Sequence, residues 1–276
     1  MNNATMSNTQ IKKHLRKAVR SLSFSHSQEP GAPTADLYAA TMLDDGAEVC
    51  VELVSPMASG LSADELVALF DTDQKRRSRA FSHPWIEGAD EKLFVGIPLH
   101  AQDLIFRPDM FTPTGIQKDK TEAQYCLLAR KRNKIVGMVM FRVRLITFED
   151  LDMANPDAED MRTLDFDVHL DLVYVCSRHR NKGYGKALMA GVANVFDEEL
   201  RHLCGQLSPV AKVLGEPFKM QTYAYGDWVS RTGKLAYMHM AEELDCIIDV
   251  HNDACPEEQP ERAALDLEHC VEDAGY

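Results

Sequence analysis

A short basic segment with two closely spaced glycines is the part of this sequence best suited to bind an anion. It reads VCSRHRNKGYGKALM over residues 175–189, and it holds five arginine, histidine or lysine side chains and no acidic one. Apolar residues at helical spacing follow, so the segment is expected to open a helix whose first N–H groups lack partners within the helix. Such a helix start attracts anions, and Gly183 and Gly185 would let a ligand approach the backbone closely. The segment predicts a phosphate-binding loop, with a loop of solvated lysines and no ligand as the alternative.

Two common phosphate-binding patterns fail on spacing. A Walker A loop needs a glycine at position 180 and a serine or threonine at position 187, and this chain has Arg180 and Ala187 there. A dinucleotide fingerprint needs three glycines, and this segment has two. The loop is therefore expected to be a phosphate site of another kind.

Polar residues alternate with apolar ones along the strand predicted just before this loop, DFDVHLDLVYV at 165–175. The alternation predicts one face with Leu170, Leu172 and Tyr174, and the other with Asp165, Asp167, His169, Asp171 and Val173. Asp165 and Asp167 are expected to lie in water beyond the sheet edge. His169 and Asp171 lie deeper, so they are candidates for catalysis or substrate binding, with a hydrogen bond to a backbone carbonyl as the alternative for His169.

The rest of the chain alternates predicted strands and helices. Strands are predicted at 47–54, 165–175, 218–225 and 246–250, a hairpin at 124–145 that turns at 130–134, and helices at 62–81, 186–203 and 232–244. Residues 82–118 support no assignment. The order of the elements indicates an α/β (α+β) domain built around a mixed sheet.

Composition narrows the class of protein. The chain has 276 residues, 45% of them apolar, and no apolar run approaches the roughly 20 residues of a membrane span. It lacks the apolar core of a secretory signal. Seven scattered cysteines without a C-x-x-C pair indicate reduced thiols, and neither a disulfide frame nor a zinc site. We therefore expect a cytoplasmic protein without a metal.

The charge is unevenly distributed and suggests three regions. Residues 1–45 form a basic extension and linker, 46–250 the main domain, and 251–276 an acidic tail that is expected to be mobile. Within the extension, residues 9–22 have helical spacing; they either pack on the body or form a basic arm for an anionic partner. The net charge of −13 makes nucleic acid an unexpected partner. Removal of the tail is expected to leave activity near that of the intact chain.

The order of strand, R-x-x-G-x-G from Arg180 to Gly185, and helix resembles the acetyl-CoA-binding motif of the GNAT superfamily of N-acetyltransferases. The stretch LDLVYVCSRHRNKGYGKALM at 170–189 carries most of the likeness, and GYG is similar to the histone acetyltransferase branch. The predicted hairpin, with Gly137, matches the second and third strands of the superfamily. The resemblance implies a mostly antiparallel central sheet, flanked by helices and splayed at the acetyl-CoA site.

The same resemblance implies how acetyl-CoA would bind. Its pyrophosphate would contact the N–H groups of Arg180, Asn181, Lys182, Gly183, Tyr184 and Gly185. Its pantetheine arm would lie along the backbone of Val173, Tyr174 and Val175. The nucleotide 3′-phosphate would be within reach of Lys182, Lys186 or Arg178.

For catalysis, the resemblance places His169 where the histone acetyltransferase branch has its glutamate base. Asp171 could orient His169 or attract a cationic acceptor. The family often takes its general acid from a tyrosine in the helix after the fifth strand. Tyr237 is the candidate here, with a core tyrosine as the alternative, and Tyr223 and Tyr225 could line the acceptor pocket.

The function implied is transfer of an acetyl group from acetyl-CoA to a primary amine, either a small amine or a lysine side chain, by direct attack on the thioester. Two alternatives stay open: a catalytically silent module that senses acyl-CoA, and an acyltransferase to a non-amine acceptor. Acetyl-CoA and an amine acceptor are the expected partners, without a membrane, and a homodimer is one open option for assembly.

Overall fold

The computed structural model describes residues 6–25, 37–42, 48–54, 121–132, 134–151, 153, 155–226, 231–253 and 264–270. The predicted helix at 62–81 and the segment 82–118 lie outside these ranges. No helix among the described residues has both the length and the apolar character needed to cross a membrane.

The described strands form one sheet whose spatial order follows the chain. Its seven strands are β1 (Leu37–Met42), β2 (Glu48–Val54), β3 (Glu122–Lys131), β4 (Lys134–Ile146), β5 (Thr163–Val175), β6 (Phe218–Gly226) and β7 (Leu265–Cys270). From β1 to β5 each neighbouring pair is antiparallel, whereas β5–β6 and β6–β7 are parallel. The predicted mixed, mostly antiparallel sheet flanked by helices is confirmed, and so is the predicted hairpin, which is β3–β4.

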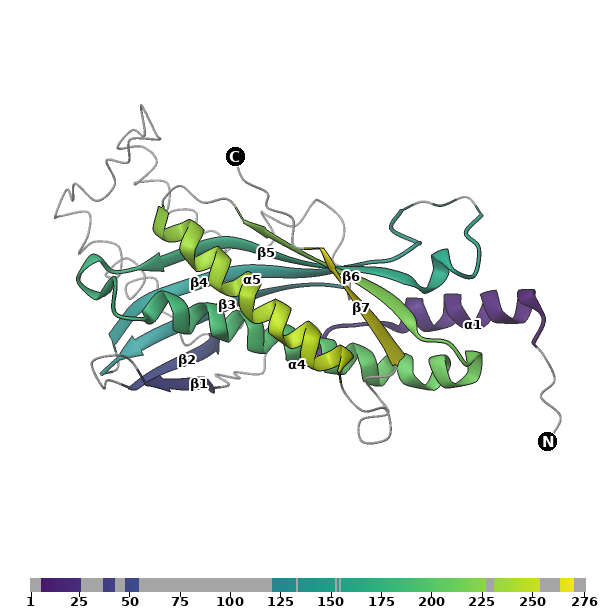
Figure 1. The fold of residues 1–276 in the computed structure, drawn as a ribbon, viewed down its shortest axis with the longest axis horizontal. Helices are drawn as coiled ribbons and strands as arrows, with labels where there is room; N and C mark the ends of the chain where they lie inside the picture. The colour runs from purple at the N-terminus through teal and green to yellow at the C-terminus, as the bar shows by residue number, and fades with distance from the viewer. Residues whose placement is uncertain are drawn as a thin grey trace, which may run out of the picture.

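Helices connect the parallel strands, because a parallel pair cannot be joined by a tight turn. The helix α4 (Tyr184–Leu214) joins β5 to β6, and α5 (Arg231–Asn252) lies between β6 and β7 in the chain. The helix α4 contacts β1 to β5, while α5 packs on α4 and β7 (Figure 1). The helix α1 (Asn8–Ser21) packs on α4. The main core therefore lies between the sheet and these helices.

The strand β5 changes its facing pattern at a bulge. Leu170 pairs with Phe141 and Leu172 with Met140 of β4, so Asp171 is the extra residue. Before the bulge Leu170 lies in the core, and after it Val173 packs against that same core. The expectation that Leu170, Leu172 and Tyr174 share one face, with Val173 on the other, is therefore wrong. One inserted residue shifts the two-residue alternation by one position.

The predicted strand at 246–250 is also wrong, because these residues belong to α5. Met240, Leu244 and Ile248 are fully buried at a spacing of four, which is the period of a helix packed along one face. The short apolar run was ambiguous between the two structures, and only the longer pattern distinguishes them.

The expectation of a mobile acidic tail is wrong for residues 265–270, which form β7 at the edge of the sheet. Leu265 and Leu267 are 4% exposed and belong to the main core, whereas Asp266 between them is exposed on the other face of the strand. The end of α5 holds the strand: the Asn252 side-chain amide donates to the Leu267 carbonyl at 2.9 Å, and His251 Nε2 lies 3.2 Å from the Leu265 carbonyl.

We predict that Leu267→Ala lowers the free energy of unfolding by about 2–5 kcal/mol, because it leaves a cavity in the core. Urea denaturation measures the change. Leu235→Ala serves as the control, because Leu235 lies in α5 with 48% of its surface exposed. Equal midpoints for the two variants would contradict the packing of β7. Removal of 251–276, which would also remove this strand, is accordingly expected to destabilise the domain.

The N-terminal helix α1 packs on the body of the domain. This is one of the two interpretations of residues 9–22. Ser7 and Gln10 form a capping box at its start, and Leu15 and Val19 are buried. Beyond the helix, the fully buried carboxylate of Glu199 in α4 accepts hydrogen bonds from Ser25 and from the Tyr125 hydroxyl of β3. The buried cluster includes residues from all three of the regions expected from charge.

Candidate functional site

The basic glycine loop makes a sharp turn between β5 and α4. Asn181 and Gly183 have φ of 57° and 84°, which is the left-handed region, and α4 begins at Tyr184. No side chain caps this helix start, and the first helical hydrogen bond described runs from the Ala187 N–H to the Gly183 carbonyl at 2.9 Å. The N–H groups of the first turn before Ala187 therefore have no partner within the helix.

The space beside this turn suits an anion. Apart from the helix itself, no heavy atom of the described residues lies within 4 Å of a Cβ placed on Gly185, so the described backbone is open to a ligand at this point. Arg178, Lys182 and Lys186 are exposed around it. The positive end of the helix dipole, unpaired N–H groups and mobile cations all favour a phosphate at this position.

Two of the predicted cofactor residues hold the loop in shape. The Arg180 side chain turns back, so that its Nε donates to the Val175 carbonyl at 2.9 Å and its guanidinium lies 5.9 Å from the centre of the Tyr174 ring. Tyr184 is fully buried and meets the His179 ring edge-on at 5.5 Å. Asn181, Lys182 and Lys186 are exposed instead.

The described pairing between β5 and β6 stops before this loop. The register of β5 with β6 ends at Leu170 opposite Gly226, whereas β5 continues to Val175 and stays paired with Gly137 of β4. Residues 171–175 thus extend past the described part of β6. An extended ligand could lie along this edge by strand addition.

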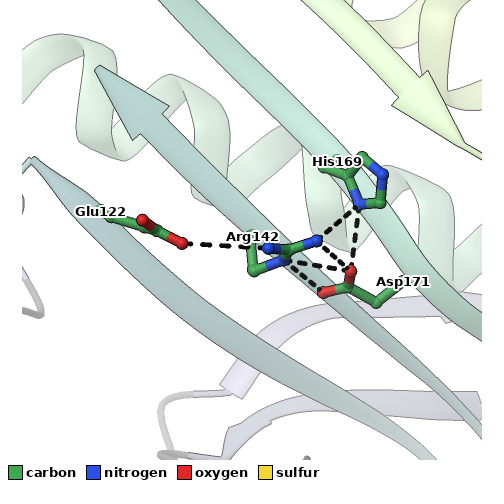
Figure 2. A network of polar contacts seen from close by, with 4 residues as sticks. All are labelled: Glu122, Arg142, His169 and Asp171. Carbon is green, nitrogen blue, oxygen red and sulfur yellow. Dashed lines mark hydrogen bonds and ion pairs between the residues drawn. The ribbon is translucent and has the colours of Figure 1, made fainter. Parts of the chain in front are cut away.

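A polar cluster lies on the sheet at the start of the opening (Figure 2). Arg142 of β4 is directly opposite His169 of β5 in the register. Its guanidinium donates to both Asp171 oxygens, from Nε at 3.0 and 3.1 Å and from the terminal nitrogen at 2.8 Å. His169 Nδ1 lies 3.0 Å from Asp171 Oδ1 and 3.3 Å from that terminal nitrogen. Glu122 of β3 is 4.0 Å from the other end of the guanidinium.

The Asp171 carboxylate is the buried centre of the cluster. Its side chain is 7% exposed, against 37% for His169. Burial acts to raise the pKa of Asp171, but hydrogen bonds from His169 and Arg142 and the charge of Arg142 outweigh it, and the pKa is lowered. An ionised Asp171 accepts a hydrogen bond from the Nδ1–H of His169, which leaves Nε2 as the nitrogen that carries the lone pair.

Asp165 and Asp167 lie within the sheet, so the expectation that they sit in water beyond its edge is wrong. Asp167 pairs with Arg144 of β4 on one side and Tyr223 of β6 on the other. Burial, and then the charge of Asp165, raise the pKa of Asp167 to about 6, although Arg144 and His169 act to lower it. Burial also raises the pKa of Asp165.

The raised pKa of Asp167 predicts a pH-dependent gain from Asp167→Asn. The folded state binds the proton of the Asp167 carboxyl more tightly than the unfolded chain does. The protonated carboxyl therefore favours folding in acid, and this contribution is lost as pH rises from the ordinary value of 3.8 through about 6. At pH 8 we expect the variant to melt about 2–4 °C higher, or ~1 kcal/mol after solvent screening of this half-buried group. Near pH 4 the two melting temperatures should agree.

Thermal melts at both pH values test this. Asp266→Asn, at an exposed position of β7, is the control and should change neither melt. An equal gain from Asp167→Asn at both pH values would show that ionisation of the carboxyl is not the cause.

The predicted acid, Tyr237, is not brought to His169. It is 2% exposed within the core beside Gly226, and its hydroxyl donates to the Ala224 carbonyl at 2.9 Å. This position favours the core interpretation. Tyr223 and Tyr225 of β6 instead share the face of His169, because Tyr225 is its partner in the register. Their rings stack with centres 6.1 Å apart.

Sequence reasoning missed Arg142. The signal was present in MFRVRLI at 140–146, where two arginines alternate with apolar residues inside a predicted strand. The same alternation on the following strand drew attention to His169 and Asp171. Their pairing with Arg142 depends on the register between the two strands, which the sequence alone leaves open.

A protein-family model matches part of the chain. Residues 99–205 match the model of the acetyltransferase (GNAT) family. Over these residues the chain is similar to the GNAT acetyltransferases, and the resemblance carried by R-x-x-G-x-G is confirmed to that extent. No curated protein sequence matches the chain.

Two solved structures are similar in part. Ribosomal-protein-alanine N-acetyltransferase from Brucella melitensis biovar Abortus 2308 is 16% identical, covers 70% of this chain and 90% of its own, and has a TM-score of 0.32. The GNAT domain of S. lividans PAT is 17% identical, covers 58% and 73%, and has a TM-score of 0.28. At such low TM-scores neither similarity bears on the substrate or the mechanism of this chain.

Proposed function

We propose that this chain is an acetyl-CoA-dependent N-acetyltransferase that acts on a primary amine, with His169 as general base. The observation that carries the proposal is the pairing of His169 with the buried Asp171 at the point where the sheet opens, beside an anion-binding helix start. The family match supports acetyl transfer in general.

The loop fits the anionic part of acetyl-CoA. The free N–H groups of the α4 start and the open space at Gly185 would hold the pyrophosphate, with Lys182 and Lys186 close by. The edge of β5 at Val173–Val175 would hold the pantetheine arm. When bound, acetyl-CoA supplies an activated acetyl group whose carbonyl carbon accepts the amine nitrogen.

The amine must lose a proton to attack, and we assign His169 Nε2 as the group that accepts it. All the contacts described for the imidazole use Nδ1, which leaves Nε2 without a partner among the described residues. The new N–C bond forms as the C–S bond breaks, the amine proton passes to Nε2, and the departing coenzyme A thiolate takes a proton from water. Asp171 stabilises the imidazolium that results.

The test is release of free coenzyme A thiol from acetyl-CoA with a panel of primary amines and matched alcohols. Turnover with an amine supports the proposal. Turnover with alcohols alone would favour a non-amine acceptor, and binding of acetyl-CoA without turnover on any acceptor would favour a sensing module. The buried cysteines Cys126, Cys176 and Cys204 form no disulfide among the described residues, which supports a reducing compartment, so we propose the cytoplasm.

A further inference from the structure

We propose that Arg142 is a positioning residue that keeps His169 neutral and fixes its tautomer through Asp171. The inference rests on the proposed function, in which His169 is the base, and it assigns to β4 a part of the catalytic apparatus. Arg142 itself need not touch the substrate, because its contacts run to Asp171, His169 and Glu122 (Figure 2).

The geometry ties the three side chains into one unit. The bulge places Asp171 where its carboxylate meets both His169 Nδ1 and the guanidinium. Nε and one terminal nitrogen of Arg142 bind the carboxylate, and Glu122 faces the other terminal nitrogen at 4.0 Å. Because a guanidinium is planar, contacts on two of its edges restrict its rotation.

This arrangement selects the tautomer. A carboxylate that is held ionised can only accept, so the proton of a neutral imidazole stays on Nδ1, 3.0 Å away, and the lone pair on Nε2. The Arg142 nitrogen, 3.3 Å from Nδ1, is also a donor, so it acts on the imidazole through its charge and not by a hydrogen bond. Arg142 contributes to the ionised state of Asp171 by hydrogen bonding and by its charge, which lower the pKa of that carboxyl despite its burial. Without Arg142, the buried carboxylate would lose two donors and much of its compensating charge.

Arg142 also balances the charge around the imidazole. The charged and titratable groups that face His169 are Glu122 from β3, Arg142 and Arg144 from β4, Asp167 and Asp171 from β5, and Tyr223 and Tyr225 from β6. The carboxylates favour imidazolium, and imidazolium cannot act as a base. Arg142 is the cation in direct contact with Nδ1, at 3.3 Å, so it opposes protonation most strongly.

The test is the pH profile of kcat/KM for Arg142→Gln and Arg142→Lys. Loss of the positive charge in Arg142→Gln should move the acid limb about one pH unit higher, which is a loss on the order of tenfold at pH values on the limb. Activity should recover toward the wild-type plateau at high pH. Arg142→Lys, which keeps a cation, should restore the position of the limb.

Two further variants separate this effect from a loss of folding. Asp171→Asn should move the limb in the opposite direction and lower the plateau, because it removes the anion and the acceptor for Nδ1. Arg20→Gln breaks an arginine–carboxylate pair of similar geometry, with Glu149 at 2.8 Å, and should leave the profile unchanged. An Arg142→Gln enzyme that loses activity equally at every pH, with its limb in place, would overturn the inference.

A measurement without turnover makes the result independent of the proposed reaction. Nitrogen-15 NMR of the free protein, with His169→Ala used to assign the signal, reports the protonation midpoint and the tautomer of the imidazole. We expect a higher midpoint in Arg142→Gln than in the wild type. If the midpoint rises and no amine is acetylated, the role of Arg142 stands and the proposed function fails. An unchanged midpoint would overturn the role of Arg142, whatever the activity.

Discussion

His169→Ala is expected to lower kcat/KM by about 10²–10⁴-fold and to remove the acid limb of its pH profile. The physical reason is that Nε2 would no longer take the proton of the attacking amine, so only the small fraction of amine that is already neutral could react. Steady-state rates at saturating acetyl-CoA, measured from pH 6 to pH 9.5, give both quantities. At high pH the difference between variant and wild type should narrow, because solvent then supplies the neutral amine.

His239→Ala is a closely matched control. His239 of α5 also has Nδ1 beside a carboxylate, at 3.3 Å from Glu242, and its side chain is 42% exposed against 37% for His169. It should leave both rate and profile unchanged. If His169→Ala keeps the wild-type rate and limb, His169 is not the base, and Asp171 becomes the residue to replace.

Gly185→Val is expected to abolish measurable binding of coenzyme A while the domain stays folded. The new side chain would enter space that no other part of the described structure occupies, so the fold has nothing to clash with. That same space is where the pyrophosphate is proposed to approach the helix start, and a β-branched side chain would exclude it. Isothermal titration calorimetry with coenzyme A and a thermal melt measure the two effects.

The control for this experiment lies on the same helix. An added Cβ at Gly205 of α4 would likewise meet no heavy atom within 4 Å among the described residues outside the helix, so Gly205→Val makes an equivalent change away from the loop. Gly183 is a poorer choice, since its φ of 84° would strain a valine and confound binding with folding. Unchanged affinity in a folded Gly185→Val protein would remove the cofactor assignment.

Local patterns predicted the elements that position the site. The hairpin and β5 have strong apolar alternation. The turn into α4 is marked by two closely spaced glycines, of which Gly183 adopts the left-handed region. The position of His169 and Asp171 on one face followed from the same alternation. Each of these signals is local in the sequence, so no knowledge of distant contacts was needed.

What could not be predicted depends on pairing between distant segments. The bulge at Asp171 has no turn residue to mark it, and it reversed the expected faces of Leu172, Val173 and Tyr174. The strand β7 is rich in acidic residues, and only its packing on β6 and α5 makes Leu265 and Leu267 part of the core. Arg142 joins the site through the register of β4 with β5.

The buried carboxylate of Glu199 limits which substitutions homologous sequences can carry at this position. Its donors come from two places, the hydroxyl of Tyr125 in β3 and the backbone and side chain of Ser25 after α1. A homologue that lacked the N-terminal helix would either expose the Glu199 carboxylate or leave it buried with too few hydrogen-bond donors, at a cost of several kcal/mol. Position 199 and the segment that ends at Ser25 are therefore expected to covary, with an apolar residue at 199 in any relative whose domain begins at the sheet.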